Sequence, residues 1–334
     1  MLNTFCIYRV DMKRDYEKDW LSYSSQLRQL QDRGLVINSG DEERALRKLR
    51  TIGYYRLSGY FYSFREHATC GSKKRLDQFK PDTELQHILE IYAFDKKIKL
   101  LIMDGLERIE IAIRAELVYY LGEINPRLSE FTEQNIKDHF YRGRNEIDTL
   151  LDPFIGNEKE LLKTQKTNDF LAHFKQNYAG IPPIWISSEV WTFGYLSRLL
   201  GALQANSNNK TLPLEKLAER YDVARGKELA DIIRLFSHVR NHCAHHNRVW
   251  NAVFEKRTLS NHPKTRMIKQ LCDDNKVFLT LALINHFLKQ INPSTRWGNR
   301  VQSLLENFPQ TNNEEISLRH MGYRGDQRGW MQLF

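Results

Sequence analysis

The sequence predicts an all-α fold, and three features of the chain point to it. Glycine and proline are scarce, with 17 and 9 copies in 334 residues, and they cluster between periodic segments. Several long runs place apolar residues at helical spacing. No run alternates apolar and polar residues cleanly enough to predict a β-strand.

The N-terminal part, residues 1–84, is expected to form an additional helical region. Ser39 and Glu42 have the spacing of a capping box, which predicts the start of a helix that continues through Arg50. In chain order we expect an amphipathic helix, a second helix, a block rich in aromatic residues and arginine, and a loop, at residues 14–35, 39–50, 52–65 and 68–83.

A larger helical core is expected over residues 85–306, followed by a polar tail at 307–334. Proline pairs and polar runs divide this core into segments. The expected helices occupy residues 85–121, one or two segments within 133–178, 185–203, a short segment after Pro213, 227–246 and 265–290. In the first of them, one apolar stripe should be buried, made of Ile102, Leu106, Ile109, Ile113 and Leu117.

The chain is basic, with 50 Lys and Arg against 41 Asp and Glu and a net charge of +9. This excess suits a polyanionic partner, and nucleic acid is the commonest one. An ordinary basic soluble protein would have the same balance, so charge alone does not separate the two.

The cysteines and the apolar runs indicate a cytoplasmic protein without a membrane partner. Cys6, Cys70, Cys243 and Cys272 form no C-x-x-C pair, and the first residues lack the long apolar run of a signal peptide. The most apolar run, at residues 277–284, is far shorter than the roughly 20 residues of a membrane span. We therefore expect free thiols in a reducing compartment.

The segment at 236–250 reads F-S-H-V-R-N-H-C-A-H-H-N-R-V-W and holds the candidate site. Four of the eleven histidines of the chain fall between 238 and 246. On a helix, the apolar residues of this region form one stripe, made of Leu229, Ile232, Ile233, Phe236, Val239 and Cys243.

Arg240 lies at the edge of that stripe, where a partly buried guanidinium needs acceptors. Asn241 and His245 lie one helical turn apart. If the helix continues, Arg248 falls between Arg240 and Asn241, and Ala244 leaves room for a ligand. The result is one polar face on a mostly apolar helix.

These residue types suit RNA cleavage by transesterification, in which the 2′-hydroxyl loses a proton and the leaving 5′-oxygen gains one. An imidazole can do either at neutral pH. A fixed guanidinium stabilises negative charge on the phosphoryl oxygens, and an amide can orient either group. The candidate catalytic residues are Arg240, Asn241 and His245, and this chemistry needs no metal or cofactor.

Other histidines of the segment have more ordinary explanations. A histidine near a helix end is more often a cap or a surface residue, so His246, like Arg248, is only a supporting candidate. His242 and His246 also have metal-ligand spacing, with Cys243 nearby, which leaves a zinc site open. No second ligand group supports that site.

Glu110 is a further supporting candidate, because it borders the buried stripe of its helix. Glu110 and Arg114 are four residues apart, and an ordinary surface salt bridge between them is the favoured interpretation. The functional alternative is that Glu110 pairs with Arg240 and aims it.

The block at 52–65 contains the candidate RNA-binding residues Tyr55, Arg56 and Tyr60. Aromatic rings mixed with cations bind single-stranded RNA by stacking. A packed aromatic core is the favoured alternative for this block.

These residues resemble a known family. Arg240-Asn241-x-x-x-His245 matches the R-[N/D/H]-x-x-x-H motif of the HEPN ribonuclease superfamily. The longer string R-N-H-C-A-H-H-N-R-V-W is similar to the signature of Abi-family abortive-infection proteins of the AbiD/AbiF-like group. Three more blocks resemble that group, in the expected order: I-G-Y-Y-R-L-S-G-Y at 52–60, L-E-R-I-E-I-A-I-R at 106–114 and P-I-W-I-S-S-E-V-W-T-F-G-Y-L-S at 183–197.

The resemblance implies a HEPN-type helical bundle, a role in phage defence or as a toxin, and a metal-independent endoribonuclease. Because the chain has one such motif, a homodimer is the expected way to complete a site, with His245 of each protomer as acid and base. Some relatives are paired with a small RNA that restrains them, so the expected partners are substrate RNA and a small non-coding antitoxin RNA.

A non-catalytic module that holds a structured small RNA is the main alternative to the nuclease. A nucleotide-modifying toxin and a DNA-binding repressor have weaker support, because the sequence shows neither a glycine-rich phosphate loop nor a recognition helix.

Overall fold

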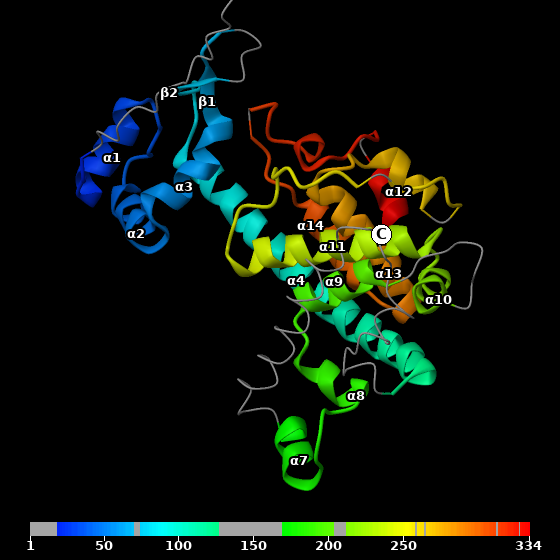
Figure 1. Cartoon of the computed structure of the whole chain (residues 1–334). Coiled ribbons are helices and arrows are strands. Elements are labelled where there is room, and N and C mark those ends of the chain that lie inside the picture. Colours follow the sequence, from blue (N-terminus) through cyan, green and yellow to red (C-terminus); the bar gives the residue numbers. More distant parts are fainter. Residues whose placement is uncertain are drawn as a thin grey trace, which may run out of the picture. The chain divides into compact units, whose positions relative to one another are not determined.

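The chain is described by a computed structural model that covers residues 19–69, 74–126, 169–203 and 212–334, apart from 258, 264, 312 and 327. It divides into two compact units, Met1–Ile88 and Leu89–Phe334. The described residues are predominantly helical and contain one small two-stranded sheet (Figure 1). The prediction of an all-α fold is therefore confirmed.

Among its described residues, the first unit contains three short helices, α1 (Tyr23–Asp32), α2 (Glu42–Ile52) and α3 (Tyr54–Phe61), and the 3₁₀ turn η1 (Tyr62–Phe64). The capping box predicted at Ser39 is wrong, because Asp41 is the residue that precedes the first turn of α2. Gly40 has φ +88°, a left-handed conformation that prevents the helix from extending back to Ser39.

Residues 68–83, expected as a loop, include a strand. β1 (Arg65–His67) pairs antiparallel with β2 (Arg75–Phe79). Asp77 stabilises the pair, since its carboxylate accepts hydrogen bonds from Arg33 at 3.0 Å and Arg65 at 3.2 Å. Only Phe79 of β2 is buried, so the strand lacks the alternation by which a sequence reveals strands.

The second unit is helical throughout its described elements. α4 (Leu85–Ile124) is its longest helix and begins just before the boundary between the units. The others are α7 (Asp169–Asn177), α8 (Ile184–Ser187), η3 (Ser188–Val190), α9 (Phe193–Ala202), α10 (Pro213–Arg220), α11 (Gly226–Ala244), α12 (Arg266–Leu271), α13 (Val277–Ile291), α14 (Trp297–Glu306), η4 (Leu318–Met321) and η5 (Gly329–Leu333).

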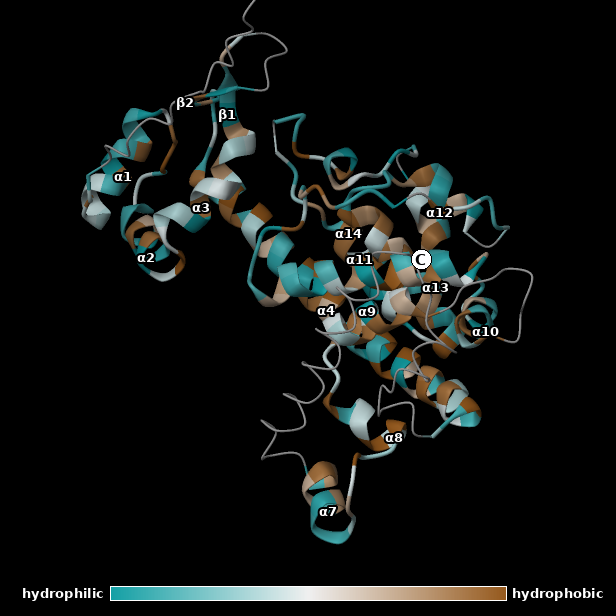
Figure 2. Cartoon of the chain, viewed as in Figure 1, coloured by the Kyte–Doolittle hydropathy of each residue, from teal (hydrophilic) through white to brown (hydrophobic). Residues whose placement is uncertain are grey.

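The buried core of this unit includes apolar side chains of α4, α9, α11 and α13, and Figure 2 shows the apolar residues of these helices in brown. Both predicted apolar stripes, on α4 and on α11, are buried to 5% exposure or less. Gly105 marks a close approach, since a Cβ there would lie 2.5 Å from the Ile284 side chain. Trp297 of α14 also donates from Nε1 to the carbonyl of Leu101 at 3.0 Å. α4 therefore packs closely against both α13 and α14.

Several expected helices have different ends from those predicted. The helix expected at 265–290 is two helices, α12 and α13, separated at residues 272–276. The helix expected at 185–203 is interrupted before α9, where the Thr192 hydroxyl accepts a hydrogen bond from the Tyr195 amide at 3.1 Å. Of the helices expected within 133–178, only α7 lies among the described residues.

Residues 307–334 pack onto the second unit. The Phe308 ring contacts Phe94 of α4 edge to face, with centroids 4.8 Å apart. Asn285, which is buried in α13, donates to the carbonyl of Leu333 at 2.8 Å. The polar composition of this segment hid a set of buried apolar side chains: Phe308, Ile316, Met321, Tyr323, Trp330, Leu333 and Phe334.

Cys243 and Cys272 are buried free thiols, whereas Cys6 and Cys70 lie outside the described residues. In the part of the chain that the structure describes, no helix has both the length and the apolar character to cross a bilayer.

Asp95, on the buried face of α4, makes the contact that fixes the chain after α11. Its side chain is fully buried, and Oδ1 accepts hydrogen bonds from the amides of Val249 at 3.0 Å and Trp250 at 2.7 Å. Oδ2 lies 3.1 Å from Lys99 Nζ. A buried carboxylate is stable only with such partners.

Asp95→Ala should lower the free energy of unfolding by about 3 kcal/mol, because it leaves two buried amides without their acceptor and Lys99 without its carboxylate partner. Urea denaturation followed by circular dichroism measures this loss. The control is Asp104→Ala, which removes an exposed carboxylate of the same helix and should change stability by less than about 0.5 kcal/mol. Equal effects of the two variants would contradict the role of Asp95.

Candidate active site around Arg240 and His245

α11 ends in a tight turn that sets the direction of the motif residues. The His246 amide donates to the Cys243 carbonyl at 3.0 Å, and the Asn247 amide donates to the His242 carbonyl at 2.9 Å. His246 itself has φ +58°. This is the bonding pattern of a Schellman motif, with histidine in the left-handed position where glycine is usual.

The turn corrects the position expected for Arg248. α11 ends at Ala244, with His245 as its cap residue, so Arg248 does not continue the helical face between Arg240 and Asn241. Arg248 instead lies within electrostatic range of Lys276. The pKa of that lysine is lowered mainly by burial and further by the charge of Arg248. A helical projection could not foresee this, because it assumes that the helix continues.

Arg240 is half-buried at the edge of the apolar stripe, as predicted. Its Nη1 donates to Oδ1 of Asn241 at 3.1 Å. The guanidinium also lines an open hollow of about 410 Å³ together with Met103, Asp104, Glu107 and Glu110. α11 thus supplies the cation of this hollow, and α4 supplies three carboxylates.

Glu110 pairs with Arg114 as the favoured interpretation has it, but the pair is not on the surface, since the two side chains are only 14% and 16% exposed. Arg114 Nη2 lies 2.6 Å from Oε1 of Glu110 and also donates to the Trp191 carbonyl at 2.9 Å. Burial raises the pKa of Glu110, while the charges of Arg114 and Arg240 oppose that rise. Among the described residues, Glu110 therefore has Arg114 as its ion-pair partner and senses Arg240 through charge alone.

The other two carboxylates of the hollow differ from each other. Asp104 pairs with Arg300 at 2.9 Å. Glu107 is exposed and has no ion-pair partner among the described residues. The α4 side of the hollow is therefore acidic, and an anionic substrate can approach Arg240 more readily from the exposed face of α11.

Asn241 and His245 lie on that exposed face. The His245 amide donates to the carbonyl of Asn241 at 2.9 Å, which confirms that the two residues follow each other by one turn. The helix thus presents an exposed imidazole one turn after the amide that accepts from the Arg240 guanidinium, and such groups can exchange a proton and bind a phosphate.

His242 occupies a different environment from His245. It is half-buried, its ring meets Phe254 edge to face with centroids 5.4 Å apart, and its Nδ1 is buried without a partner. Burial first, and then the nearby His238 and His245, lower the pKa of His242. The residues that the structure describes contain no cluster of three His, Cys, Asp or Glu that could hold a metal.

The candidate RNA-binding block lies in the first unit and is part core and part surface. Tyr60 is only 2% exposed and packs in the interior, so it is not available for stacking. Tyr55 is 86% exposed, and its neighbour Arg56 is also exposed. The core interpretation thus holds for Tyr60 and leaves Tyr55 and Arg56 as the surface part.

Asp95 is the important residue that the sequence analysis missed. Its signal was a carboxylate at a position of α4 where the helical period requires an apolar side chain, between Ile91 and Ile98. The burial of Val249 and Trp250 explains why the motif string continues to V-W beyond its histidines.

Comparison with known proteins agrees with the ordered blocks. The model of the family described as "Abi-like protein" matches residues 47–251, more than half of the chain. The match includes all four blocks, from the one at 52–60 to the histidine-rich segment. No curated protein and no solved structure matches the chain. Because the family model matches more than half of the chain, the chain belongs to the family of Abi-like proteins, the abortive-infection family that its motifs predict.

Proposed function

We propose that this protein is an endoribonuclease of phage defence that cuts RNA by attack of the 2′-hydroxyl, without a metal. The supporting observation is the end of α11, where Asn241 holds Arg240 at 3.1 Å and His245 caps the same helix in an exposed position. Arg240 binds the phosphoryl oxygens and stabilises their developing charge. His245 transfers the proton, and Asn241 orients the guanidinium. The products carry 2′,3′-cyclic phosphate and 5′-hydroxyl ends.

The site is proposed to be completed by a second copy of the chain, so that one His245 acts as base and the other as acid. An exposed apolar stripe on α4 supports this. Ile111 is 57% exposed and Tyr119 is 71% exposed, and Ile111 follows Glu107 of the hollow by one turn. A copy docked there would bring its own motif close to the first.

The main alternative remains a non-catalytic protein that holds a structured small RNA, and the same RNA could restrain the nuclease. Two exposed rings of the first unit carry cations, with Arg50 over Tyr23 and Arg75 over Tyr62, each at 5.7 Å. Such pairs present stacking faces and charge together, which suits single-stranded RNA.

His245→Ala should abolish RNA cleavage in EDTA, because the site loses its proton carrier, while the fold is retained. Labelled RNA resolved on a denaturing gel measures this, and circular dichroism checks the fold. The matched control is His246→Gly, which should still cleave RNA. Its free energy of unfolding should stay within about 1 kcal/mol of the parent's, because glycine takes the left-handed conformation freely. Activity in His245→Ala together with its loss in His246→Gly would reverse the assignment.

Glu110→Gln should leave cleavage within about threefold of the parent, because the ion-pair partner of Glu110 is Arg114 rather than Arg240. Since burial raises the pKa of Glu110, the folded protein keeps that proton to higher pH than the unfolded chain does. The stability due to the carboxyl is therefore present at low pH and lost as pH rises through the raised pKa. The variant should gain stability relative to the parent over that window in urea titrations. A tenfold loss of kcat in a folded variant would instead make Glu110 a positioning residue for Arg240.

Ile111→Glu should convert a dimer to a monomer and reduce cleavage at the same time, since a charge on the apolar stripe opposes docking. Sedimentation velocity measures the mass, and a cleavage assay runs on the same samples. Met267→Glu, which places the same charge on an exposed apolar site of α12, serves as the control. A monomeric parent with full activity would exclude the dimeric site and leave the nuclease itself standing.

A further inference from the structure

α11 carries an exposed polar stripe along its whole length. Most of its residues are buried, and one narrow sector reaches solvent, made of Lys227, Asp231, Arg234, His238, Asn241 and His245. The spacings of four and three residues keep these side chains on one line. From Lys227 to His245 the stripe is about 27 Å long at the helical rise of about 1.5 Å per residue.

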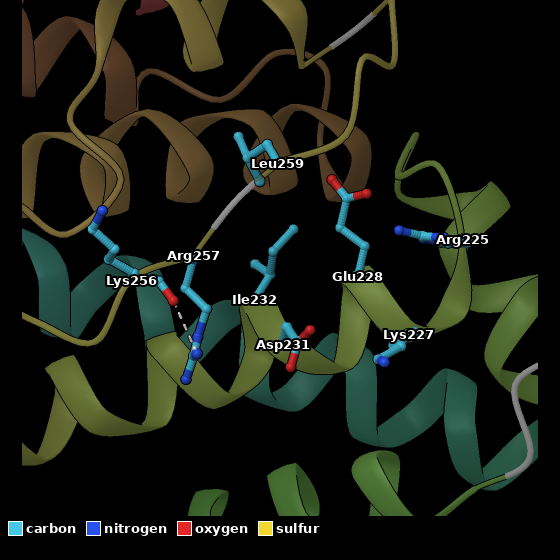
Figure 3. Close-up of a pocket in the computed structure, with 8 residues that line it drawn as sticks. All are labelled: Arg225, Lys227, Glu228, Asp231, Ile232, Lys256, Arg257 and Leu259. Atoms are coloured by element: carbon cyan, nitrogen blue, oxygen red, sulfur yellow. Dashed lines mark hydrogen bonds between the residues drawn. The ribbon is translucent and has the colours of Figure 1, made fainter.

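The far end of this stripe opens into a pocket of about 250 Å³ (Figure 3). α11 and the residue before it contribute one wall, and Lys256, Arg257 and Leu259 contribute the other. The lining consists of four cations, two carboxylates and two apolar residues: Arg225, Lys227, Lys256, Arg257, Glu228, Asp231, Ile232 and Leu259. The pocket therefore has an excess of two positive charges.

Two of these cations are available to a ligand. The side chains of Arg225 and Lys227 have no ion-pair or hydrogen-bond partner within the described part of the chain, and both residues are exposed. The N-terminus of α11 is already capped, because the Gly226 amide donates to Oε2 of Glu215 at 2.8 Å. The attraction for an anion therefore comes from the cationic side chains and not from the helix end.

The opposite wall contains a buried guanidinium with an unused donor. The side chain of Arg257 is only 10% exposed and pairs with Glu255, and its Nη1 donates to the Lys256 carbonyl at 3.1 Å. Its Nε is buried and has no hydrogen-bond partner among the described residues. Arg257 therefore adds a fixed positive charge to this wall of the pocket, and a nearby anion would stabilise that charge.

The wall is also held rigidly enough to form a site. Glu228 is 6% exposed, and its Oε1 accepts a hydrogen bond from the Ser260 amide at 3.1 Å. This bond ties Ser260, next to Leu259 of the wall, to α11, and the Arg257 amide donates to the Asp274 carbonyl at 2.8 Å. Oε1 of Glu228 is thus occupied by a hydrogen bond within the protein. Asp231 is the exposed carboxylate of the pocket.

We infer that this pocket is an anion subsite that holds a backbone phosphate of the RNA strand whose scissile bond lies at His245. The inference rests on the proposed nuclease function and names how its substrate is held. Arg234 and His238 lie between the pocket and Asn241 on the same stripe, so a single strand can follow the helix from one end to the other. A pocket of this size admits one phosphate with its sugar and not a duplex.

The test uses the full chain with His245→Ala, so that RNA stays intact, and measures fluorescence anisotropy with RNAs of about four and about twelve nucleotides. Arg225→Gln with Lys227→Gln should weaken binding of the longer RNA at least about tenfold and leave the shorter RNA unaffected. The salt dependence of binding should also fall, by about 0.7 in slope for each lost phosphate contact. The control, Arg296→Gln with Arg328→Gln, removes the same charge from exposed sites elsewhere and should change neither RNA.

A variant of opposite sign sharpens the test. Asp231→Asn removes the exposed carboxylate of the pocket, so it should tighten binding of the longer RNA about two- to fivefold. Equal weakening by both double variants, or no effect of Asp231→Asn, would overturn the subsite. Tight binding of adenosine diphosphate with no difference between the two RNAs would overturn it in favour of a free nucleotide.

The failure of the subsite can be told from the failure of the nuclease. If the parent cuts RNA and the Arg225 and Lys227 double variant cuts the longer RNA equally well, the subsite is wrong and the nuclease stands. If the parent cuts no RNA but the double variant loses binding as described, the subsite stands on a protein that only binds RNA.

Discussion

The buried contact of Asp95 with the chain after α11 is the constraint on which the candidate site depends. Its carboxylate accepts hydrogen bonds from the amides of Val249 and Trp250 and pairs with Lys99. In this way α4 fixes the residues that follow the motif. Lys99 also donates to the carbonyl of Asn247 at 3.3 Å. The turn at His246 is therefore held from both sides, by the helix before it and by α4 after it. Without that anchor, the end of α11 would be free to fray, because the last turn of a helix lacks hydrogen-bond partners for its carbonyls.

The same anchor explains why a histidine is kept in a conformation that favours glycine. With φ +58°, His246 costs energy that a glycine would save. The turn that it makes ends the helix at Ala244 and leaves His245 exposed beside Asn241. Strain of this kind persists where the surrounding structure determines the backbone, and it is frequent at functional sites. The position of His245 is thus a consequence of packing between α4 and α11 and not of its own side-chain contacts.

The apolar stripes of the helices and their burial could be predicted from the sequence. The residues at which helices end and the turns between them could not. The apolar stripes of α4 and α11 were correct because each is set by a repeat of many residues. Arg240 was placed correctly at the edge of such a stripe, whereas Arg248 was misplaced because the helix stops four residues earlier. The strand β2 escaped notice because its order comes from Asp77, which pairs with arginines distant in the sequence. The break between α12 and α13 falls on the polar run at Asp273, Asp274 and Asn275, a turn signal that the expected single helix at 265–290 passed over.

The charges around α11 give its two ends different tasks. At the motif end, Arg240 faces three carboxylates of α4, so its attraction for anions is weakened on that side and retained toward solvent. At the other end, the pocket that α11 forms with Lys256, Arg257 and Leu259 has more cations than carboxylates. A long polyanion can contact both ends of α11 at once. It is attracted by the cationic pocket even where the carboxylates of α4 offset the charge of Arg240, whereas a small anion can contact only one end. This distribution favours an extended strand over a mononucleotide as the ligand of the helix, because only a strand can satisfy both ends simultaneously.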